Sequence, residues 1–352
     1  MLDEIRQQPD ILDRTLRQDL AGVERLRKAL AARRPRYIML AARGTSDNAA
    51  TFGRYLLEIG TGIPVSLAAP SVFTLYGVQG FDFRDSLVVA ISQSGESTDI
   101  NVVLEAAKAQ GAVTVGITNE SSSALAKLAE HVFLVRAGRE KSVAATKTYA
   151  GQLLVFYLLA YALGAPILLD DLRRLPGYAA AALRLEPQIA DLAPRYCFMT
   201  NAVVVGRGLN YANAFEFALK MMETCYVVAE RFSSADFLHG PIAIVESSFP
   251  VFLFAPPGVT WPSLEGLLAK LSATGAEMFL ISDKSNAPAM KTPGARGVVI
   301  GKNLSFKGPL PAEVYTPIPY IVPAQMFAAI LASEKGLNPD KPRGLQKVTR
   351  TM

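Results

Sequence analysis

The chain has 352 residues, enough for two domains of ordinary size that each bury a core. Half of the residues are hydrophobic and only 19% are charged, with a formal net charge of +5 spread along the chain, so no basic stripe indicates a nucleic-acid partner. The two cysteines, Cys197 and Cys225, lie far apart without histidine or cysteine at metal-ligand spacing, which excludes a disulfide framework and a zinc ribbon.

The first residues of the chain are charged and helical in pattern, unlike the basic and apolar segments of an export signal. No stretch reaches the roughly 18 uninterrupted apolar residues that a membrane helix requires. Together with the scarcity of cysteine, these features predict a cytoplasmic protein without a membrane partner.

In chain order, the sequence predicts two leading helices, a first domain, a helical linker, a second domain and a C-terminal arm. Their expected limits are residues 1–34, 35–170, 171–194, 195–335 and 336–352. The arm is expected to be irregular but to follow a defined path, because Pro339, Pro342 and Gly344 interrupt any helix there.

Within the first domain, short apolar strands alternate with helical stretches of ten or more residues. One strand ends at Arg43-Gly44, Ser86 to Ile91 form another, and Val113 to Ile117 follow the helix Ile100 to Gln110. Strands that are apolar throughout and separated by helices indicate a parallel sheet covered on both faces. The expected fold class is therefore α/β, with ligands bound at the carboxyl ends of the strands.

The strand Ser86 to Ile91 runs directly into the turn Ser92-Gln93-Ser94-Gly95-Glu96-Ser97, which a helix follows. Such a turn points backbone N–H groups and hydroxyls at one place, near the positive end of the helix. It has no lysine, unlike a loop that binds a Mg-nucleotide, so it suits the phosphate of a small ester. On these residues alone, a Ser/Thr-capped helix after a buried strand explains the pattern equally well.

The second domain repeats the first at an offset of 163 to 164 residues. Gly44 falls on Gly208, and the turn at Gly95 falls on a turn at Gly258. The repeat predicts two tandem doubly wound parallel sheets. The second turn, Ala255 to Thr260, has lost most hydroxyls and two N–H donors, so only the first is expected to bind a phosphate.

Three charged residues, Glu216, Lys220 and Glu223, lie on one face of a helix predicted over Asn213 to Val227. Apolar residues surround them, and burial raises the pKa of a carboxyl from about 4.3 toward the range of about 6 to 7 that suits proton transfer. For Glu216 and Lys220, an ordinary surface pair is the alternative.

Histidine occurs only twice, and His131 at the start of a strand is expected to be structural. His239 is followed by Gly240-Pro241, whose unusual backbone can expose the ring for proton transfer, although a structural histidine at a turn is the alternative. In the arm, Lys347 could react with an open-chain sugar carbonyl if burial lowers the pKa of its amine. A solvated charge is the alternative for this lysine.

Together, these motifs resemble the sugar isomerase (SIS) domain family, with two tandem flavodoxin-like domains as in the isomerase half of glucosamine-6-phosphate synthases. The resemblance covers nearly the whole chain. It rests on Glu4-Ile5 to Pro9, Gly44-Thr45-Ser46, Ile91 to Ser97, Val143-Ala144-Ala145-Thr146-Lys147, Gly206-Arg207-Gly208, Leu219 to Glu223, His239-Gly240-Pro241 and Asp340 to Lys347.

The resemblance implies that the ligand is a small sugar phosphate and that no metal or other cofactor is needed. It assigns the phosphate to Ser46, Ser92, Gln93, Ser94 and Ser97, and the sugar hydroxyls to Thr45 and the backbone of Val143. Glu223 would carry the proton between C1 and C2, His239 would open the ring, and Lys347 would engage the open-chain ketose. Because the family's histidine reaches the site of the neighbouring subunit, a homodimer with shared active sites is implied, and whether His239 acts in its own site stays open.

Three residues of the expected sugar-binding set depart from the synthase pattern. Arg43 stands in place of a cysteine, Ala145 in place of a serine, and Gln346 in place of an alanine. The run Arg43 to Asn48 resembles more closely the stand-alone amino-sugar phosphate deaminases of the family. The resemblance includes no glutaminase domain, so we expect no release of ammonia from glutamine.

The expected function is therefore an enzyme, an amino-sugar phosphate deaminase and isomerase. It would convert glucosamine 6-phosphate, or a related amino-sugar phosphate, to the ketose phosphate and ammonia. Two alternatives stay open: a sugar-phosphate-binding regulator that performs no chemistry, and an aldose–ketose phosphate isomerase that releases no ammonia. The sequence does not fix the epimer, the N-substituent or the direction of the reaction.

Overall fold

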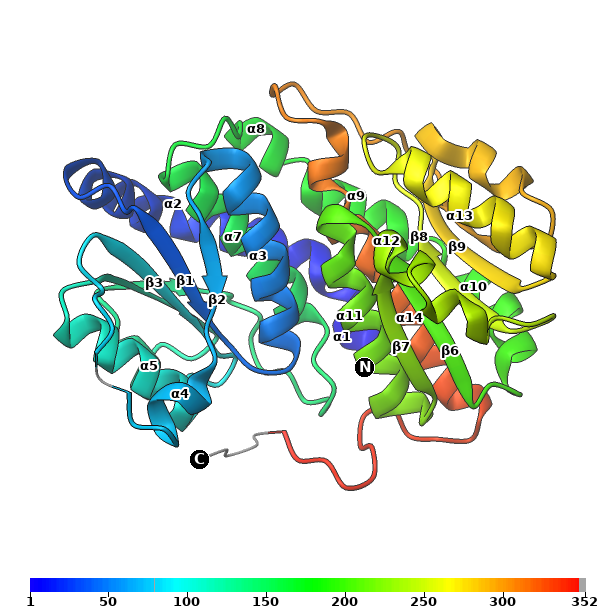
Figure 1. Ribbon diagram of the computed structural model, residues 1–352, viewed down its shortest axis with the longest axis horizontal. Helices are drawn as coiled ribbons and strands as arrows, with labels where there is room; N and C mark the ends of the chain where they lie inside the picture. Colours follow the sequence, from blue (N-terminus) through cyan, green and yellow to red (C-terminus); the bar gives the residue numbers. More distant parts are fainter. Residues whose placement is uncertain (79, 348–352) are drawn as a thin grey trace. The chain divides into compact units, whose positions relative to one another are not determined.

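The computed structural model describes residues 1–78 and 80–347 (Figure 1). The chain forms two compact units, each with one five-stranded sheet. The first-sheet unit comprises Asp10–Glu140, Lys147–Arg173 and the described residues from Gln346 onward, and the second-sheet unit comprises Met1–Pro9, Lys141–Thr146 and Arg174–Leu345. No helix within these described ranges has both the length and the apolar character needed to cross a bilayer.

The first sheet has the strand order β2-β1-β3-β4-β5, and every neighbouring pair is parallel. Its strands are β1 (Tyr37–Ala41), β2 (Val65–Leu67), β3 (Ser86–Ile91), β4 (Val113–Thr118) and β5 (His131–Leu134). The helices around it are α2 (Gln8–Ala32), α3 (Thr45–Thr61), α4 (Pro70–Thr74), α5 (Thr98–Ala109), α6 (Ala124–Leu128), α7 (Lys147–Ala162) and α8 (Leu169–Leu172). Every residue of β3 and β4 is buried, as expected for strands covered on both faces.

Close packing fixes the helices on the first sheet. On one side, α5 contributes Ile100, Val103 and Leu104 to an apolar cluster that also contains residues of β3. Helix α7 is almost entirely buried, and its Phe156 ring contacts the backbone of α3 at Gly53, where a Cβ would lie only 2.3 Å from the ring. This glycine inside a helix therefore serves helix–helix contact.

The second sheet has the order β10-β9-β8-β6-β7, again with parallel pairs throughout. Its strands are β6 (Asn201–Gly206), β7 (Val228–Ser233), β8 (Pro250–Phe254), β9 (Glu277–Asp283) and β10 (Ala295–Ile300). The α-helices of this unit are α1 (Leu2–Arg6), α9 (Leu175–Leu183), α10 (Glu186–Leu192), α11 (Tyr211–Lys220), α12 (Ser234–Leu238), α13 (Trp261–Thr274) and α14 (Pro317–Glu334). Followed from β7 to β10, the order repeats that of β2 to β5, which confirms the two tandem doubly wound sheets.

Shorter helical segments join the elements of the second-sheet unit. The 3₁₀ segments are η1 (Ala193–Tyr196), η2 (Gly208–Asn210), η4 (Pro241–Ile244), η5 (Lys284–Lys291) and η6 (Ala312–Tyr315), and η3 (Met221–Cys225) is a π-helical segment. Because η3 follows α11 directly, the single helix predicted over Asn213 to Val227 is wrong in its last turn. There the backbone takes a π-helical form and ends at Tyr226 in the left-handed region.

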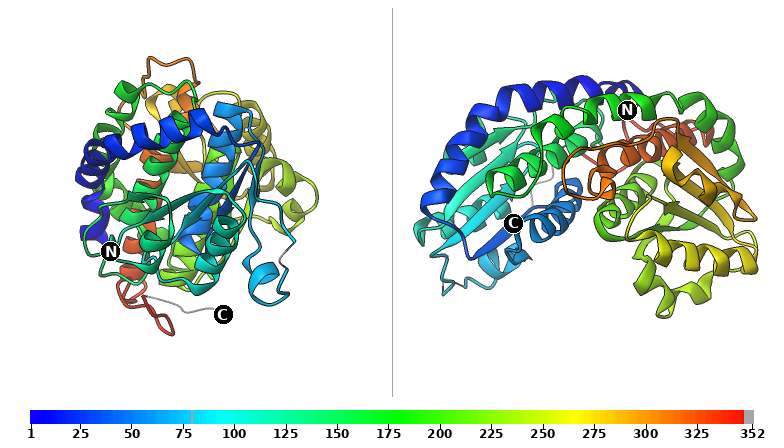
Figure 2. Two further views of the ribbon diagram at one scale, coloured as in Figure 1. Left: turned by 90° about the vertical axis from the view of Figure 1, so that its left-hand side faces the viewer. Right: turned by 90° about the horizontal axis from the view of Figure 1, so that it is seen from above.

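Alternate residues of β8 face the two helical layers of the second sheet. The right-hand view of Figure 2 shows α13 (yellow) and α14 (orange-red) on opposite faces of that sheet. Val251 and Leu253 belong to the apolar cluster that includes Leu264 of α13. Phe252 points the other way, with its ring centroid 5.1 Å from that of Phe327 on α14. Both faces of the strand are therefore core, which explains its continuous apolar sequence.

The compact units differ from the expected domain limits because the beginning of the chain packs with the second-sheet unit. The carboxylate of Glu4 accepts hydrogen bonds from the N–H groups of Lys141 and Ser142, the latter at 3.2 Å. The N-terminal amine pairs with Asp340. These contacts join residues 1–9 and 141–146 to the arm, whose described residues follow an irregular path as expected.

A polar cluster at the start of β9 forms charge-assisted hydrogen bonds within the second-sheet unit. Arg195 donates to both carboxylate oxygens of Glu277 at 2.8 Å, and Tyr196 Oη donates to Oε1 at 3.1 Å. The hydrogen bonds from Arg195 are the main reason that the pKa of Glu277 lies below its ordinary value of 4.5, although burial opposes them. The ionised form of Glu277 therefore contributes to stability.

We expect Glu277→Gln to lower the free energy of unfolding by about 1 kcal/mol at neutral pH, because Arg195 is half exposed and water screens the lost interaction. The pKa of Glu277 is lower in the folded state, so its contribution is full above the unfolded pKa and is lost as the pH falls through the folded pKa. Urea unfolding at about pH 7 and about pH 3 measures the difference between the two proteins. A difference that is as large at the lower pH as at pH 7 would contradict this role.

Candidate active site

The turn between β3 and α5 is closed by hydrogen bonds among its own residues. Gly95 N–H donates to Ser92 Oγ at 3.1 Å, and the hydroxyls of Ser92 and Ser97 lie 3.0 Å apart. Glu96 N–H donates to Ser94 Oγ at 3.3 Å. Gly95 has a φ of +67°, which the turn requires and which side chains disfavour. The serine hydroxyls are therefore held in place at the start of α5, whose N-cap residue is Ser97.

A second turn lies beside the first, because β1 and β3 are neighbours whose ends align at Ala41 and Ala90. The chain leaves these two strands toward opposite edges of the sheet, which is the topological switch point where such sheets bind ligands. Ser46, in the first turn of α3, is buried and accepts a hydrogen bond from Gln152 Nε2 of α7 at 2.9 Å. The structure thus places the expected phosphate set, the turn Ser92–Ser97 and Ser46, at the carboxyl ends of β1 and β3.

Arg43 connects the two turns. Its Nε donates to Asp99 Oδ2, in the first turn of α5, at 2.7 Å, while half of the Arg43 side chain stays exposed. Burial raises the pKa of the nearby Asp47 carboxyl, and the charge of Arg43 opposes that change. Thr45, the first residue of α3, lies next to Arg43 and Gly44 in the same turn. The guanidinium of Arg43 is therefore held at the carboxyl end of the strands, where the serines lie.

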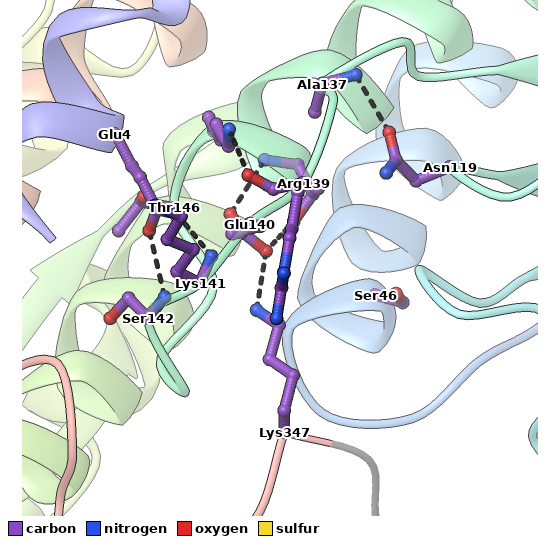
Figure 3. A network of polar contacts seen from close by, with 12 residues as sticks. Glu4, Ser46, Asn119, Ala137, Arg139, Glu140, Lys141, Ser142, Thr146 and Lys347 are labelled. Atoms are coloured by element: carbon purple, nitrogen blue, oxygen red, sulfur yellow. Dashed lines mark hydrogen bonds and ion pairs between the residues drawn. The ribbon is translucent and has the colours of Figure 1, made fainter.

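The described end of the arm returns to the first-sheet unit at Glu140. Lys347 Nζ donates to Glu140 Oε2 at 2.9 Å, and Thr148 donates to the same carboxylate through its hydroxyl at 2.9 Å and its N–H at 3.3 Å. Figure 3 shows Lys347 and Arg139 beside this carboxylate. The Glu140 side chain is fully buried, so the ion pair defines the position of the lysine amine.

Residues of both the arm and the serine-rich turn line a cavity of about 350 Å³. Its walls include Gln93, Ser94, Arg139, Glu140 and Lys347. This volume is within the range of small-molecule sites, and the wall carries hydroxyl, amide and charged groups. Arg139 and Glu140 were missed in the sequence, where only their position just before the run Val143–Lys147 hinted at a role.

The second-sheet unit contains the charged residues predicted on α11. Lys220 Nζ lies 2.6 Å from Glu223 Oε2 and 3.4 Å from Glu216 Oε1. Glu216 and Lys220 are buried, with 0% and 1% of their side chains exposed, so the surface-pair alternative is wrong. Glu223 lies in the π-helical segment η3 and is 23% exposed. Such segments are frequent at functional sites, and here one carries Glu223, the one of these two carboxylates that reaches the surface.

The remaining predicted residues of the second-sheet unit are His239, Val143 and Ala145. His239 is exposed at the end of α12, and no hydrogen bond connects its imidazole with another residue in the described ranges. Gly240 follows with a φ of +138°, so the unusual backbone expected there is confirmed. Val143 N–H donates to the Asp340 carbonyl at 3.1 Å, and Ala145 is half-buried in the same segment.

Gln346 is exposed and precedes Lys347. The expected set is thus divided: the phosphate set, Arg43, Thr45, Gln346 and Lys347 belong to the first-sheet unit, and Val143, Ala145, Glu223 and His239 to the second-sheet unit. Within the described parts of the chain, no group of three or more acidic, histidine or cysteine side chains is arranged to hold a metal ion.

The chain matches a protein family and is similar to known proteins of that family. Residues 33–162 and 199–293 match the model of the SIS domain. The chain is 35% identical over 99% of its length to a glutamine–fructose-6-phosphate aminotransferase (isomerizing) of Methanothermobacter thermautotrophicus, of which it covers 56%. The chain therefore spans little more than half the length of that relative.

Solved structures have the same fold. The C-terminal domain of glucosamine-fructose-6-phosphate aminotransferase from Francisella tularensis is 26% identical, with a TM-score of 0.86 over 97% of this chain and 98% of that domain. A glucosamine-6-phosphate deaminase from Thermotoga maritima has a TM-score of 0.75 at 22% identity, with 99% of both chains covered. This second likeness shows the fold alone.

The geometry of the serine-rich turn predicts the effect of Gly95→Ala. An added Cβ would lie 2.2 Å from Ser123 Oγ in a backbone conformation that alanine disfavours, so the turn must shift. We expect the variant to bind inorganic phosphate at least about tenfold more weakly, because one charge-assisted hydrogen bond contributes about 1.5 to 3 kcal/mol. Isothermal titration calorimetry measures this affinity.

Gly111→Ala provides the matched control. Gly111 follows α5 with a φ of +84°, but a Cβ there would meet nothing within 4 Å. Both variants carry the backbone strain, and only Gly95→Ala disturbs the turn. Equal phosphate affinity in the two variants would contradict a role of the turn in anion binding.

Proposed function

This chain belongs to the SIS domain family, and we propose that it is an amino-sugar phosphate deaminase and isomerase. Its substrate would be glucosamine 6-phosphate or a related amino-sugar phosphate, and its products the ketose 6-phosphate and ammonia. The observation that carries the proposal is the carboxylate of Glu223, which a buried lysine holds at 2.6 Å while it stays accessible. A protein that only binds sugar phosphates does not need such a group.

The phosphate of the substrate is assigned to the serine-rich turn. Three hydroxyls of this turn and the hydroxyl of Ser46 lie at the start of two helices, where the helix dipoles favour an anion. The exposed part of Arg43 adds a positive charge beside the serine-rich turn. Phosphate binding there would orient the rest of the sugar without a metal ion.

Glu223 is proposed to carry the proton in the isomerisation. Its carboxylate would remove the proton from C2 of the open-chain aldose while O1 takes a proton from solvent, which gives an enolamine. It would then return the proton to C1 while the nitrogen gives a proton back to solvent. The product is an imine at C2, and water then replaces its nitrogen to release ammonia and the ketose. Lys220 and Glu216 act through Glu223, because the ion pairs fix the orientation of its carboxylate.

His239 and Lys347 are proposed to act before and after this proton transfer. The imidazole of His239 is exposed and can move a proton between the ring oxygen and the anomeric hydroxyl, which opens the sugar ring. Lys347 would engage the open-chain ketose, and its ion pair with Glu140 positions the amine beside Gln93 and Ser94. A homodimer that shares active sites through His239 is part of the same proposal.

The names of the relatives favour sugar-phosphate chemistry but differ in the fate of nitrogen. The Methanothermobacter relative is named as an aminotransferase, and the Thermotoga protein as a deaminase. The run Arg43–Asn48, which resembles the deaminases, supports deamination of the sugar by this chain. Glutamine would then not be a nitrogen source, and adding it with fructose 6-phosphate is a control for the assay.

The central test is Glu223→Gln assayed with glucosamine 6-phosphate. The variant keeps the size of the side chain but cannot accept the C2 proton, so we expect turnover to fall by at least about a hundredfold. The Kd for the sugar phosphate should stay within about threefold, because Glu223 does not hold the phosphate. Coupled ammonia detection measures turnover, and calorimetry measures binding.

Glu230→Gln is the control for this variant, since it changes an exposed carboxylate of β7 in the same unit. Near-normal ammonia release by Glu223→Gln would exclude the proposed role. Binding of the sugar phosphate by the wild type without any turnover would favour the regulator instead. Turnover of glucose 6-phosphate or fructose 6-phosphate without nitrogen chemistry would favour the simple isomerase.

Ser94→Ala tests the phosphate assignment separately. Its hydroxyl orients the Glu96 N–H and lines the cavity, so its loss removes one hydrogen bond to the phosphate. We expect the KM for glucosamine 6-phosphate to rise about tenfold to a hundredfold with a smaller change in kcat. Ser66→Ala, at an exposed site on β2, is the control, and an unchanged KM in Ser94→Ala would reject the assignment.

A further inference from the structure

The second sheet has a turn at the same topological position as the serine-rich turn of the first sheet. The chain leaves β6 and β8, which are neighbours, toward opposite edges of the sheet, as it does at β1 and β3. Gly208 and Gly258 occupy the positions of Gly44 and Gly95, and all four have positive φ values. The second sheet therefore has glycine-containing turns with positive φ at its switch point, as the first sheet does.

The carboxylate of Glu313, from the segment η6, occupies this position. Thr260 donates to it twice, through its hydroxyl to Oε1 and through its N–H to Oε2 at 3.3 Å. Thr260 is the N-cap residue of α13 and corresponds in the repeat to Ser97, the N-cap residue of α5. A Cβ on Gly258 would lie 2.5 Å from Glu313 Oε2, so the carboxylate rests directly on the turn.

Burial makes this carboxylate unusual. Only 3% of Glu313 is exposed, and none of the described lysine, arginine or histidine residues forms an ion pair with it. A buried carboxylate without a cation needs other compensation. The start of α13 supplies it, because the first N–H groups of a helix are unpaired and carry its positive dipole end.

We propose that the second sheet is an anion site whose ligand is the Glu313 carboxylate of the same chain. The carboxylate stands at the position in the second sheet that corresponds to the serine-rich turn of the first sheet. A small oxyanion such as formate takes the place of the carboxylate when it is removed. The proposal concerns the second sheet alone and does not depend on the reaction.

The segment η6 that supplies Glu313 also contacts the beginning of the helix that carries the charged residues. Thr316 N–H donates to the Glu313 carbonyl at 3.1 Å, and Asn210 Nδ2 donates to Thr316 Oγ1 at 2.8 Å. Asn210 is the last residue of η2 and directly precedes α11. The segment that supplies Glu313 is therefore hydrogen-bonded to the beginning of the helix in which Lys220 lies.

Glu313→Ala tests the proposal through anion rescue. We expect the variant to lose about 4 to 8 °C in Tm, because the turn and the start of α13 lose their negative charge. Sodium formate at about ten times its Kd should restore about 3 °C or more, whereas formamide, a neutral molecule of similar size, should restore none of it. Formate should raise the Tm of Glu313→Ala by more than it raises that of the wild type at the same ionic strength, because the second-sheet site of the wild type is already filled.

Glu313→Gln keeps the shape of the side chain and removes its charge, which matters if the alanine variant does not fold. We expect this variant also to lose stability, and formate should not rescue it because the amide fills the site. A Tm of Glu313→Gln within about 1 °C of the wild type would overturn the proposal, since the charge would then be irrelevant. Equal effects of formate and formamide on Glu313→Ala would overturn it as well.

Discussion

Both sheets of this chain are shaped by one electrostatic requirement, the need for negative charge at the start of a helix that begins at a switch point. The first N–H groups of α5 and α13 have no partners within their helices, and the helix dipoles add positive potential there. In the first sheet, serine hydroxyls surround this place and leave room for an external anion. In the second sheet, Glu313 brings the anion from within the chain. In the two proposals, one duplicated scaffold thus supplies a site for an external anion and a site filled by the chain itself.

In the proposed function, phosphate binding belongs to the first sheet and proton transfer to the second. Because Glu313 already occupies its turn, the second sheet binds no phosphate in this proposal. It carries instead α11 with its buried charges. Placing Lys220 and Glu216 in the interior is costly, and their mutual pairing offsets that cost only when both partners are present. The gain is a fixed orientation for Glu223, which the π-helical turn lifts toward solvent. A rigid, accessible carboxylate is what proton transfer between two adjacent carbons requires.

Local sequence patterns predicted the elements well, and long-range contacts escaped them. The strand β3 has the predicted limits Ser86–Ile91, because its apolar run ends at a serine-rich turn. The repeat predicted both sheets, since strand order follows from the duplication. The π-helical segment after α11 was not predictable, because Met221, Met222 and Glu223 are good helix formers that an ordinary α-helix also accepts. Glu140 and Glu313 were missed because an acidic residue in a loop has the same local pattern whether it is exposed or buried against a partner far along the chain.

Proton NMR of glucosamine 6-phosphate incubated with the protein in D₂O tests the central claim most directly. The proposed mechanism predicts that the C2 proton signal disappears, that the signals of fructose 6-phosphate grow in, and that ammonium appears in equal amount. Deuterium at C1 of the product would identify exchange at the carboxylate during the transfer. A spectrum of glucosamine 6-phosphate that stays unchanged, while the same sample binds the sugar phosphate, would contradict the account.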